Sequence, residues 1–211
     1  MSNPLQGAQF VLAAHRISQL PPDHGAEVAF AGRSNAGKSS ALNALTGHRG
    51  LARTSKTPGR TQQMVAFSLP PKVQGEGLAP LQVRLIDLPG YGYAKVPPEL
   101  REHWKQEIDG YLHQRQSLRG IVLIADIRHP LKDFDRMMLD FCFATQLPCH
   151  VLLTKADKLS RNQSAQALAA LRKELVEGGT QATAQIFSSQ TPTGVDEARD
   201  VVVRLLNTPR E

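Results

Sequence analysis

The chain has 211 residues, of which 41% are hydrophobic and 21% charged, and its formal net charge is +6. This length suits one large domain with a sheet covered on both faces. No apolar run approaches the roughly 20 residues that span a bilayer, and no signal-peptide pattern opens the chain. Cys142 and Cys149 lie in or next to apolar runs, which favours buried free thiols over a disulfide. A membrane-spanning protein is therefore excluded, and a cytoplasmic location is the default expectation.

The positive charge is concentrated in one part of the sequence. Seven of the 25 Lys and Arg residues lie within 28–72, a stretch that contains no Asp or Glu. Outside this stretch, basic and acidic residues nearly balance. A bound magnesium triphosphate would neutralise part of this charge, and the remainder favours a second polyanion, most simply RNA. The alternative is that this stretch is only solvated and binds no second polyanion.

In chain order, residues 1–26 predict an N-terminal arm that packs on the domain edge. A breaker-rich stretch at 20–25 predicts a loop within it. Residues 27–208 are predicted to form a single domain. This domain begins with a buried strand over 27–31 and continues into a helix over 37–45.

The remaining elements alternate between short apolar strands and amphipathic helices. The segment 46–62 has no periodicity and predicts a loop. The pair 63–69 and 81–87 predicts an antiparallel hairpin at the sheet edge. The later elements are expected as a helix over 97–112, a strand over 121–125, a helix over 131–141, a strand over 151–153, a helix over 160–176, a strand over 184–187 and a helix over 195–206. This alternation predicts an α/β fold, with a mostly parallel six-stranded sheet and helices on both faces.

The most informative stretch is Gly32–Ser39, which fits the phosphate-binding pattern G-x-x-x-x-G-K-[ST]. It lies between a predicted strand and a predicted helix, which is the context that this pattern requires. Its glycines let successive backbone N–H groups point at one anion, and the positive end of the following helix faces the same point. Lys38 is suited to bind the β- and γ-phosphates, and the Ser39 hydroxyl to bind Mg²⁺.

Further polar motifs begin where predicted strands end, so they are expected at the same rim of the sheet. The first is the D-x-x-G pattern of Asp87-Leu88-Pro89-Gly90. The Asp87 carboxylate can hold a water molecule of Mg²⁺, and the Gly90 N–H can touch the γ-phosphate. The pattern is weak alone, but its position after an apolar strand strengthens it.

A second motif, Thr154-Lys155-Ala156-Asp157, is similar to the guanine-recognition pattern [NT]-K-x-D. The Asp157 carboxylate can accept two hydrogen bonds from guanine, for which adenine offers no matching donors. Thr replaces the more usual Asn, and because a hydroxyl reaches less far than an amide, contact with the other edge of the base is expected to be weaker. Ser188-Ser189, after the next strand, is expected to support guanine O6 through a backbone N–H.

The chain resembles the EngB family of bacterial GTPases (also called YihA or YsxC) from about residue 10 to its end. Four phrases carry this resemblance: Gly-Arg-Ser-Asn-Ala-Gly-Lys-Ser-Ser, Thr-Ser-Lys-Thr-Pro-Gly-Arg-Thr-Gln, Asp-Leu-Pro-Gly-Tyr-Gly-Tyr-Ala and Asp-Ile-Arg-His-Pro-Leu-Lys. The resemblance implies a Ras-like P-loop G domain. It also implies a role in assembling the large ribosomal subunit, with links to cell-cycle progression, cell division and septation.

Some site residues follow only from this resemblance. In the family, the Thr of Pro-Gly-Arg-Thr completes the Mg²⁺ shell, which is Thr61 here, although from chemistry alone Thr57 is an equal candidate. Asn35 resembles the Asn that recruits K⁺ in some related GTPases. Tyr91 follows D-x-x-G, so a water-orienting Gln is absent there, and intrinsic hydrolysis of GTP is predicted to be slow.

The predicted reaction is therefore slow hydrolysis of GTP to GDP and phosphate. The residues predicted to act in catalysis are Lys38, Thr61 and Gly90. The residues predicted to contact the nucleotide are Gly32, Arg33, Ser34, Asn35, Ala36, Gly37, Lys38, Ser39, Gly59, Arg60, Thr61, Gln62, Gln63, Asp87, Leu88, Pro89, Gly90, Thr154, Lys155, Ala156, Asp157, Phe187, Ser188 and Ser189. The predicted ligands are Ser39 and Thr61 for Mg²⁺, Asp87 through water, and Asn35 for K⁺. The expected partner is the large ribosomal subunit or its rRNA, bound through the basic segment 49–60 by a monomer without membrane contact.

Two other functions remain open at this point. A P-loop kinase or nucleotidase that does not act on the ribosome would share the phosphate loop, but no second substrate-binding segment or Arg-rich lid is apparent. A binding module that never hydrolyses nucleotide would not need Lys38, Ser39, Thr61 and Asp87 together. The preference for guanine over adenine nucleotides distinguishes the first alternative from a GTPase, and single-turnover phosphate release distinguishes the second.

Overall fold

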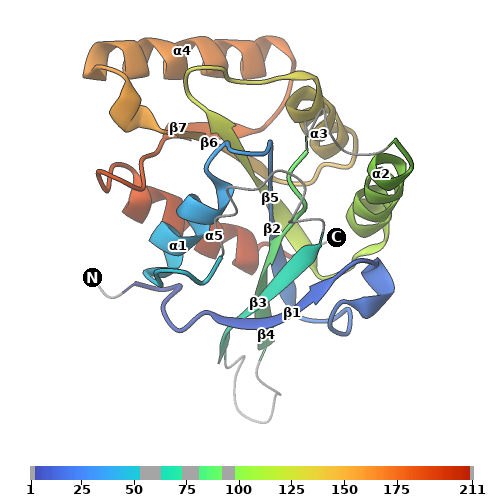
Figure 1. Cartoon of the computed structure of the whole chain (residues 1–211). Coiled ribbons are helices and arrows are strands. Elements are labelled where there is room, and N and C mark those ends of the chain that lie inside the picture. The colour runs from blue at the N-terminus through green and yellow to red at the C-terminus, as the bar shows by residue number, and fades with distance from the viewer. Residues whose placement is uncertain (1–2, 53–62, 73–80, 92–97, 210–211) are drawn as a thin grey trace.

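The computed structural model describes residues 3–52, 63–72, 81–91 and 98–209. Within these residues, seven strands form one sheet in the order β1-β3-β4-β2-β5-β6-β7, with helices on both faces (Figure 1). The strands are β1 (Gln9–Ala14), β2 (Ala26–Gly32), β3 (Met64–Lys72), β4 (Leu81–Asp87), β5 (Leu118–Asp126), β6 (Cys149–Thr154) and β7 (Thr183–Ile186). The helices are α1 (Lys38–Thr46), α2 (Pro98–Gln114), α3 (Asp133–Ala144), α4 (Arg161–Glu177) and α5 (Val195–Asn207), with 3₁₀ turns η1 (Ile17–Gln19) and η2 (Ala156–Lys158).

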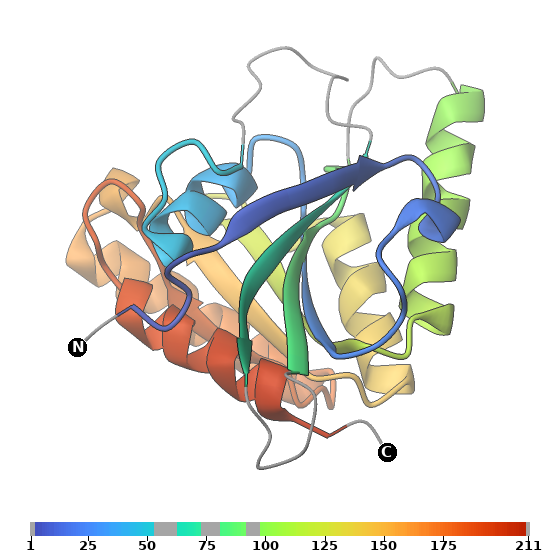
Figure 2. The same ribbon diagram turned by 90° about the horizontal axis from the view of Figure 1, so that it is seen from below.

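Five of the strands are parallel, and two antiparallel strands extend one edge of the sheet. β4, β2, β5, β6 and β7 run parallel, β3 pairs antiparallel with β4, and β1 pairs antiparallel with β3 (Figure 2). The α/β fold and the antiparallel pairing of β3 with β4 are therefore as the sequence predicted, but this pair does not form the edge of the sheet, because β1 lies outside β3. No helix of the described residues is long and apolar enough to cross a membrane.

The sheet has one strand more than predicted, because the N-terminal arm contributes β1. This strand lies at the edge of the sheet, and Phe10 and Val11 are largely exposed. The pairing of β1 with β3 shifts between Phe10 and Leu12, which is an irregularity of the bulge type. Exposure and the shift together interrupt the alternation of apolar and polar residues by which a strand is recognised in sequence.

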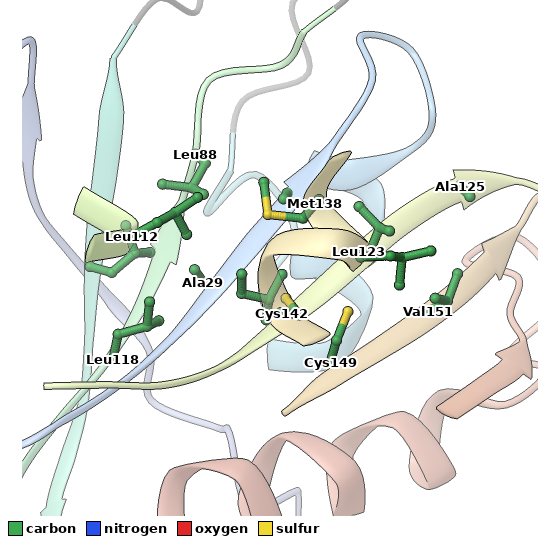
Figure 3. Close-up of a cluster of buried hydrophobic side chains, with 14 of the residues drawn as sticks. Ala29, Leu88, Leu112, Leu118, Leu123, Ala125, Met138, Cys142, Cys149 and Val151 are labelled. Carbon is green, nitrogen blue, oxygen red and sulfur yellow. The ribbon is translucent and has the colours of Figure 1, made fainter. Parts of the chain in front are cut away.

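Two hydrophobic cores lie on opposite faces of the sheet. Along β2, Val28 and Phe30 belong to the core that contains residues of α1 and α5, whereas Ala29 and Ala31 belong to the core that contains residues of α2, α3 and α4. Figure 3 shows part of the second core, where Cys142 of α3 lies beside Cys149 of β6. Both cysteines are buried free thiols, as predicted. Burial of every residue of β2 explains its continuous apolar run.

A buried charge network lies at the amino-terminal end of β2. The Glu27 carboxylate is fully buried and accepts hydrogen bonds from Arg84 Nε at 2.7 Å and from Arg115 Nη2 at 2.7 Å and Nε at 2.9 Å. The Tyr111 hydroxyl, near the end of α2, lies 3.2 Å from the same carboxylate. The two arginines also donate to the backbone carbonyls of Pro21 and Pro22 in the arm. This network joins the arm, two strands and the end of α2.

Candidate nucleotide-binding site

The predicted motifs all lie at the carboxyl ends of parallel strands. Gly32 ends β2, Asp87 ends β4 and Thr154 ends β6, while Phe187 directly follows β7. Because these strands are parallel neighbours in one sheet or separated by β5 alone, their ends meet at one rim. The prediction that the motifs converge is confirmed by direct contacts between them, described below.

Backbone geometry explains the glycines of the phosphate loop. Gly37 has φ of +100°, in the left-handed region that favours glycine, and the α1 helix begins at the next residue. At Gly32 a side chain is excluded by packing, because a Cβ atom there would lie 2.6 Å from the Ile124 carbonyl oxygen on β5. The loop is therefore pressed against the sheet and leads directly into a helix N-terminus.

Lys38 and Asp87 form an ion pair at the centre of the rim. Both side chains are almost completely buried. They come from the first residue of α1 and the last residue of β4, 49 positions apart in the chain. Among the described residues, the Ser39 hydroxyl beside them makes no hydrogen bond. A cation, a carboxylate and an available hydroxyl thus lie together where the phosphate loop meets the D-x-x-G segment.

The D-x-x-G segment is joined to the phosphate loop through its backbone. The Ser34 N–H donates to the Tyr91 carbonyl at 2.9 Å, and Gly90 lies so close to Ser34 that a Cβ atom there would come within 3.3 Å of the Ser34 Oγ atom. The Tyr91 ring stacks on Phe134 of α3 at 5.0 Å, and its hydroxyl donates to Asp135. Burial, together with the Asp135 carboxylate, raises the pKa of Tyr91 well above its ordinary value.

The guanine-recognition residues also meet across the rim. The Ser188 hydroxyl donates to Asp157 Oδ1 at 2.7 Å, and this hydrogen bond lowers the pKa of that carboxyl below its ordinary value. The Ser188 N–H already donates to the Thr193 carbonyl at 3.0 Å. Among the described residues, the Ser189 N–H makes no such bond, so of the two serines Ser189 offers the free N–H for a base.

Thr154 and Lys155 hold the phosphate loop. The buried Thr154 hydroxyl contacts the carbonyls of Ala36 in the loop and Ala125 at the end of β5. Lys155 Nζ donates to the Asn35 carbonyl at 2.6 Å and pairs with Asp126 at 2.9 Å. The Thr154 side chain is therefore engaged in positioning the loop, which gives a structural reason for its weak predicted contact with a base.

A cavity of about 230 Å³ separates the phosphate loop from the guanine-recognition residues. Predicted residues on its walls are Gly37, Thr154, Lys155, Asp157, Phe187 and Ser189. Ser40, Lys158 and Gln190 line it as well, and sequence reasoning missed them. Each of the three directly follows a predicted site residue in the sequence, and this adjacency is the signal that could have indicated them.

Several predicted site residues fall outside these contacts. Gly59, Arg60, Thr61 and Gln62 lie outside the described residues, as does most of the basic segment 49–60. Gln63 precedes β3, and its amide nitrogen lies 2.8 Å from His15 Nε2 of the arm. Contacts of all five with a nucleotide therefore stay predictions.

The residues at the rim fit a magnesium nucleotide. Among the described residues, no group of three or more His, Cys, Asp or Glu could form a metal cage by itself. Mg²⁺ usually binds one or two protein oxygens together with substrate phosphates and water. Ser39 and Asp87 are oxygen donors of this kind, so the Mg²⁺ prediction agrees with the donor set without being tested by it.

The strand order, the phosphate loop and the joined rim define a GTPase domain of the P-loop class. A family model described as "50S ribosome-binding GTPase" matches residues 27–155. A probable GTP-binding protein EngB of Stenotrophomonas maltophilia (strain K279a) is 56% identical over 203 residues, which cover 96% of this chain and 96% of the relative. A second probable EngB, of Xylella fastidiosa (strain 9a5c), is 53% identical over 100% of this chain and 99% of its own.

The chain belongs to the EngB family of GTP-binding proteins, and it is a GTPase. The fold agrees with this assignment. The crystal structure of a probable GTP-binding protein EngB aligns with a TM-score of 0.62 at 21% identity, covering 86% of this chain and 99% of that chain. A bacterial selenocysteine-specific elongation factor aligns with a TM-score of 0.61 at 16% identity, covering 89% of this chain and 29% of that one. At such identities these two likenesses concern the fold alone.

Proposed function

We propose that this GTPase is a slow molecular switch in the assembly of the large ribosomal subunit, with a further link to cell division. The observation that carries the proposal is the joined rim, in which a phosphate-binding lysine and a guanine-type carboxylate lie at opposite ends of one set of loops. The family description, which names 50S ribosome binding, supports the choice of partner. The basic stretch 28–72 supports RNA as the surface that is bound.

The proposed mechanism gives each group one role. Lys38 turns from Asp87 to the β- and γ-phosphates and neutralises charge that develops on them. Ser39 and Thr61, with Asp87 through a water molecule, would hold Mg²⁺, which would supply positive charge to the phosphates. The Gly90 N–H and the loop around Thr61 contact the γ-phosphate and relax after hydrolysis.

Slow turnover is part of this proposal. The residue after D-x-x-G is Tyr91, and its hydroxyl is directed to Asp135 on α3. A group held in this way does not orient the attacking water. Asn35 is the proposed K⁺ ligand, and a cation there would add positive charge beside the phosphates. Equal rates of GTP hydrolysis in KCl and NaCl would remove this part of the proposal.

Guanine specificity separates this function from that of a P-loop kinase. In an Asp157→Asn variant, one of the two carboxylate oxygens that accept hydrogen bonds from guanine is replaced by an amide NH₂ group, which can only donate. Each lost hydrogen bond to a charged group is worth about 1.5–3 kcal/mol, so GTP affinity should fall on the order of 100-fold or more. Xanthosine triphosphate, which presents an acceptor in place of the exocyclic amine, should bind the variant better than GTP does. An unchanged GTP affinity would contradict the assignment of Asp157.

Co-sedimentation with purified large ribosomal subunits tests the partner. Binding is expected with a non-hydrolysable GTP analogue, and much less binding with GDP. Binding should weaken steeply as salt is raised, because phosphate contacts release counterions. The small subunit serves as the control particle. Equal binding to both subunits, or none with either nucleotide, would contradict the proposal.

A further inference from the structure

A second cavity, of about 240 Å³, lies beside the phosphate loop. Its walls come from the loop (Arg33–Ala36), from the end of β5 and the residues that follow it, and from α3. The residues after β5 are the Asp-Ile-Arg-His-Pro-Leu-Lys phrase, for which the GTPase reaction gives no role. We call residues Arg128–Lys132 of this phrase the basic loop. Arg128, His129 and Lys132 within it are all exposed.

The carboxylates that line this cavity already have partners. Asp126 accepts Nε and Nη2 of Arg128 at 2.9 and 2.7 Å and pairs with Lys155 at 2.9 Å. Burial by itself would raise the pKa of Asp126, but these hydrogen bonds outweigh it and hold the pKa well below its ordinary range. Asp135 accepts the Tyr91 hydroxyl and the Lys132 N–H, the latter at 2.9 Å. Neither carboxylate needs a further cation.

Arg33, on the cavity wall, differs from these carboxylates in its contacts. Its side chain is partly buried, and among the described residues its guanidinium makes no hydrogen bond or ion pair. A guanidinium presents a planar fork of donors that fits phosphate oxygens in pairs. Arg128 and His129 of the basic loop line the same cavity and are exposed, so this arrangement suits an oxyanion that reaches Arg33 from outside.

An aromatic surface lies next to these cations. Phe134 follows the basic loop at the start of α3, is 38% exposed, and stacks on Tyr91 with its other face. An exposed ring beside a row of cations is the pattern by which proteins bind unpaired RNA bases and the adjoining backbone. A free phosphate ion would use the cationic side chains but not the ring, so the combination of the two favours RNA.

We propose that the basic loop and Arg33 form a binding site for the phosphodiester backbone of ribosomal RNA, directly behind the phosphate loop. The inference rests on the proposed action at the large subunit and adds the contact surface. Ser34 and Asn35 line this cavity and also belong to the phosphate loop, so the proposed RNA site and the predicted nucleotide site share this loop. Binding of RNA and binding of GTP are therefore coupled, and each changes the affinity of the other by the same factor.

The test compares an Arg128→Ala/Lys132→Ala double variant with a Lys173→Ala control. Lys173 is 77% exposed on α4. With the GTP analogue bound, the double variant should bind large subunits at least about 10-fold more weakly, with a salt slope reduced by about one to two. Its affinity for GDP should not change. A single Lys132→Ala variant, which removes no described ion pair, should show part of the same loss.

The outcomes distinguish the surface from the function. If the wild-type protein binds large subunits and both variants bind equally well with the same salt slope, the surface assignment is wrong and the proposed function stands. An equal loss in the Lys173→Ala control also overturns the assignment. If the wild-type protein does not bind, the proposed function fails. A repeat with protein-free ribosomal RNA should reproduce the loss, and a loss confined to intact subunits would assign the surface to a ribosomal protein instead.

Discussion

The two ends of β2 each carry a buried ion pair, and the two pairs differ in what else surrounds them. At the rim, Lys38 and Asp87 pair with one another, and the phosphate-loop residues that precede Lys38 line two cavities. At the other end, Glu27 is enclosed by Arg84, Arg115 and Tyr111, and the arginines also bind backbone carbonyls. The first pair can exchange its partner for a phosphate, whereas the second has every partner supplied by the protein.

This difference indicates which end of the sheet can move when the nucleotide changes. α2 follows the D-x-x-G segment, and its far end is fixed by Tyr111 and by Arg115 directly beyond the helix. A second anchor joins α2 to the arm, because Glu107 accepts the Ile17 N–H at 2.7 Å. A change in the nucleotide would therefore displace the rim while the opposite end stays in place. The predictions below, ordered by expected size, test this division.

The largest effect is expected from breaking the enclosed network. A Glu27→Gln variant leaves Arg84 buried without its carboxylate and leaves Arg115 with only Asp23, at 3.6 Å, as a counter-charge. Breaking a buried ion pair in this way typically costs about 3–5 kcal/mol of unfolding free energy. Urea unfolding without nucleotide measures this loss. A Glu177→Gln variant removes an exposed carboxylate paired with Lys173 at 3.7 Å and should change the free energy by less than about 0.5 kcal/mol. Equal stability of the two variants would show that the network is not a fixed anchor.

The corresponding change at the rim should act on binding. A Lys38→Ala variant removes the ammonium group that pairs with Asp87 and that binds phosphate oxygens in the proposed mechanism. GTP affinity should fall on the order of 100- to 1,000-fold, since hydrogen bonds to charged groups are worth about 1.5–3 kcal/mol each. Its nucleotide-free unfolding free energy should fall less than that of Glu27→Gln, because one buried charge loses its partner here, whereas Glu27→Gln removes the carboxylate shared by two arginines. Fluorescent nucleotide titration and urea unfolding of the same sample measure both quantities.

Sequence reasoning predicted that the motifs converge at one rim because the information for this is local. The phosphate loop, D-x-x-G and the guanine-type motif each occupy a few consecutive residues, and each follows an apolar run that marks a strand end. What it missed depends on partners far along the chain. Tyr91 meets Asp135 across 44 positions, and the Thr154 hydroxyl meets Ala36 across 118. The burial of Glu27 could not be predicted either, because nothing near it in sequence indicates two arginines.

The third prediction concerns pH and a buried histidine remote from the rim. His150 on β6 contacts Thr183 Oγ1 at 2.7 Å and Gln185 Oε1 at 3.0 Å, and burial lowers its pKa from 6.5 to about 4. Between these two values the unfolded chain binds a proton that the folded chain does not. The contribution of neutral His150 to the free energy of unfolding is therefore fully present above about pH 6.5. It is lost as the pH is lowered to 4, by about 3 kcal/mol in total.

A His150→Gln variant separates this contribution from those of other groups. Its unfolding free energy should lose less between pH 6.5 and 4 than that of the wild-type protein, by about the same 3 kcal/mol. Urea unfolding at several pH values provides the comparison. Parallel pH profiles for the two proteins would show that His150 is not held neutral in the folded state.

The smallest effect is expected where the rim joins α3. A Tyr91→Phe variant keeps the ring on Phe134 and removes only the hydroxyl that donates to Asp135, which retains the Lys132 N–H. The loss of one hydrogen bond to a buried charged acceptor should cost about 1–2 kcal/mol of unfolding free energy. Single-turnover hydrolysis of bound GTP should change little, because this hydroxyl points to α3 and orients no water. A large drop in that rate, with stability unchanged, would instead place Tyr91 in the reaction and would contradict the proposed reason for slow turnover.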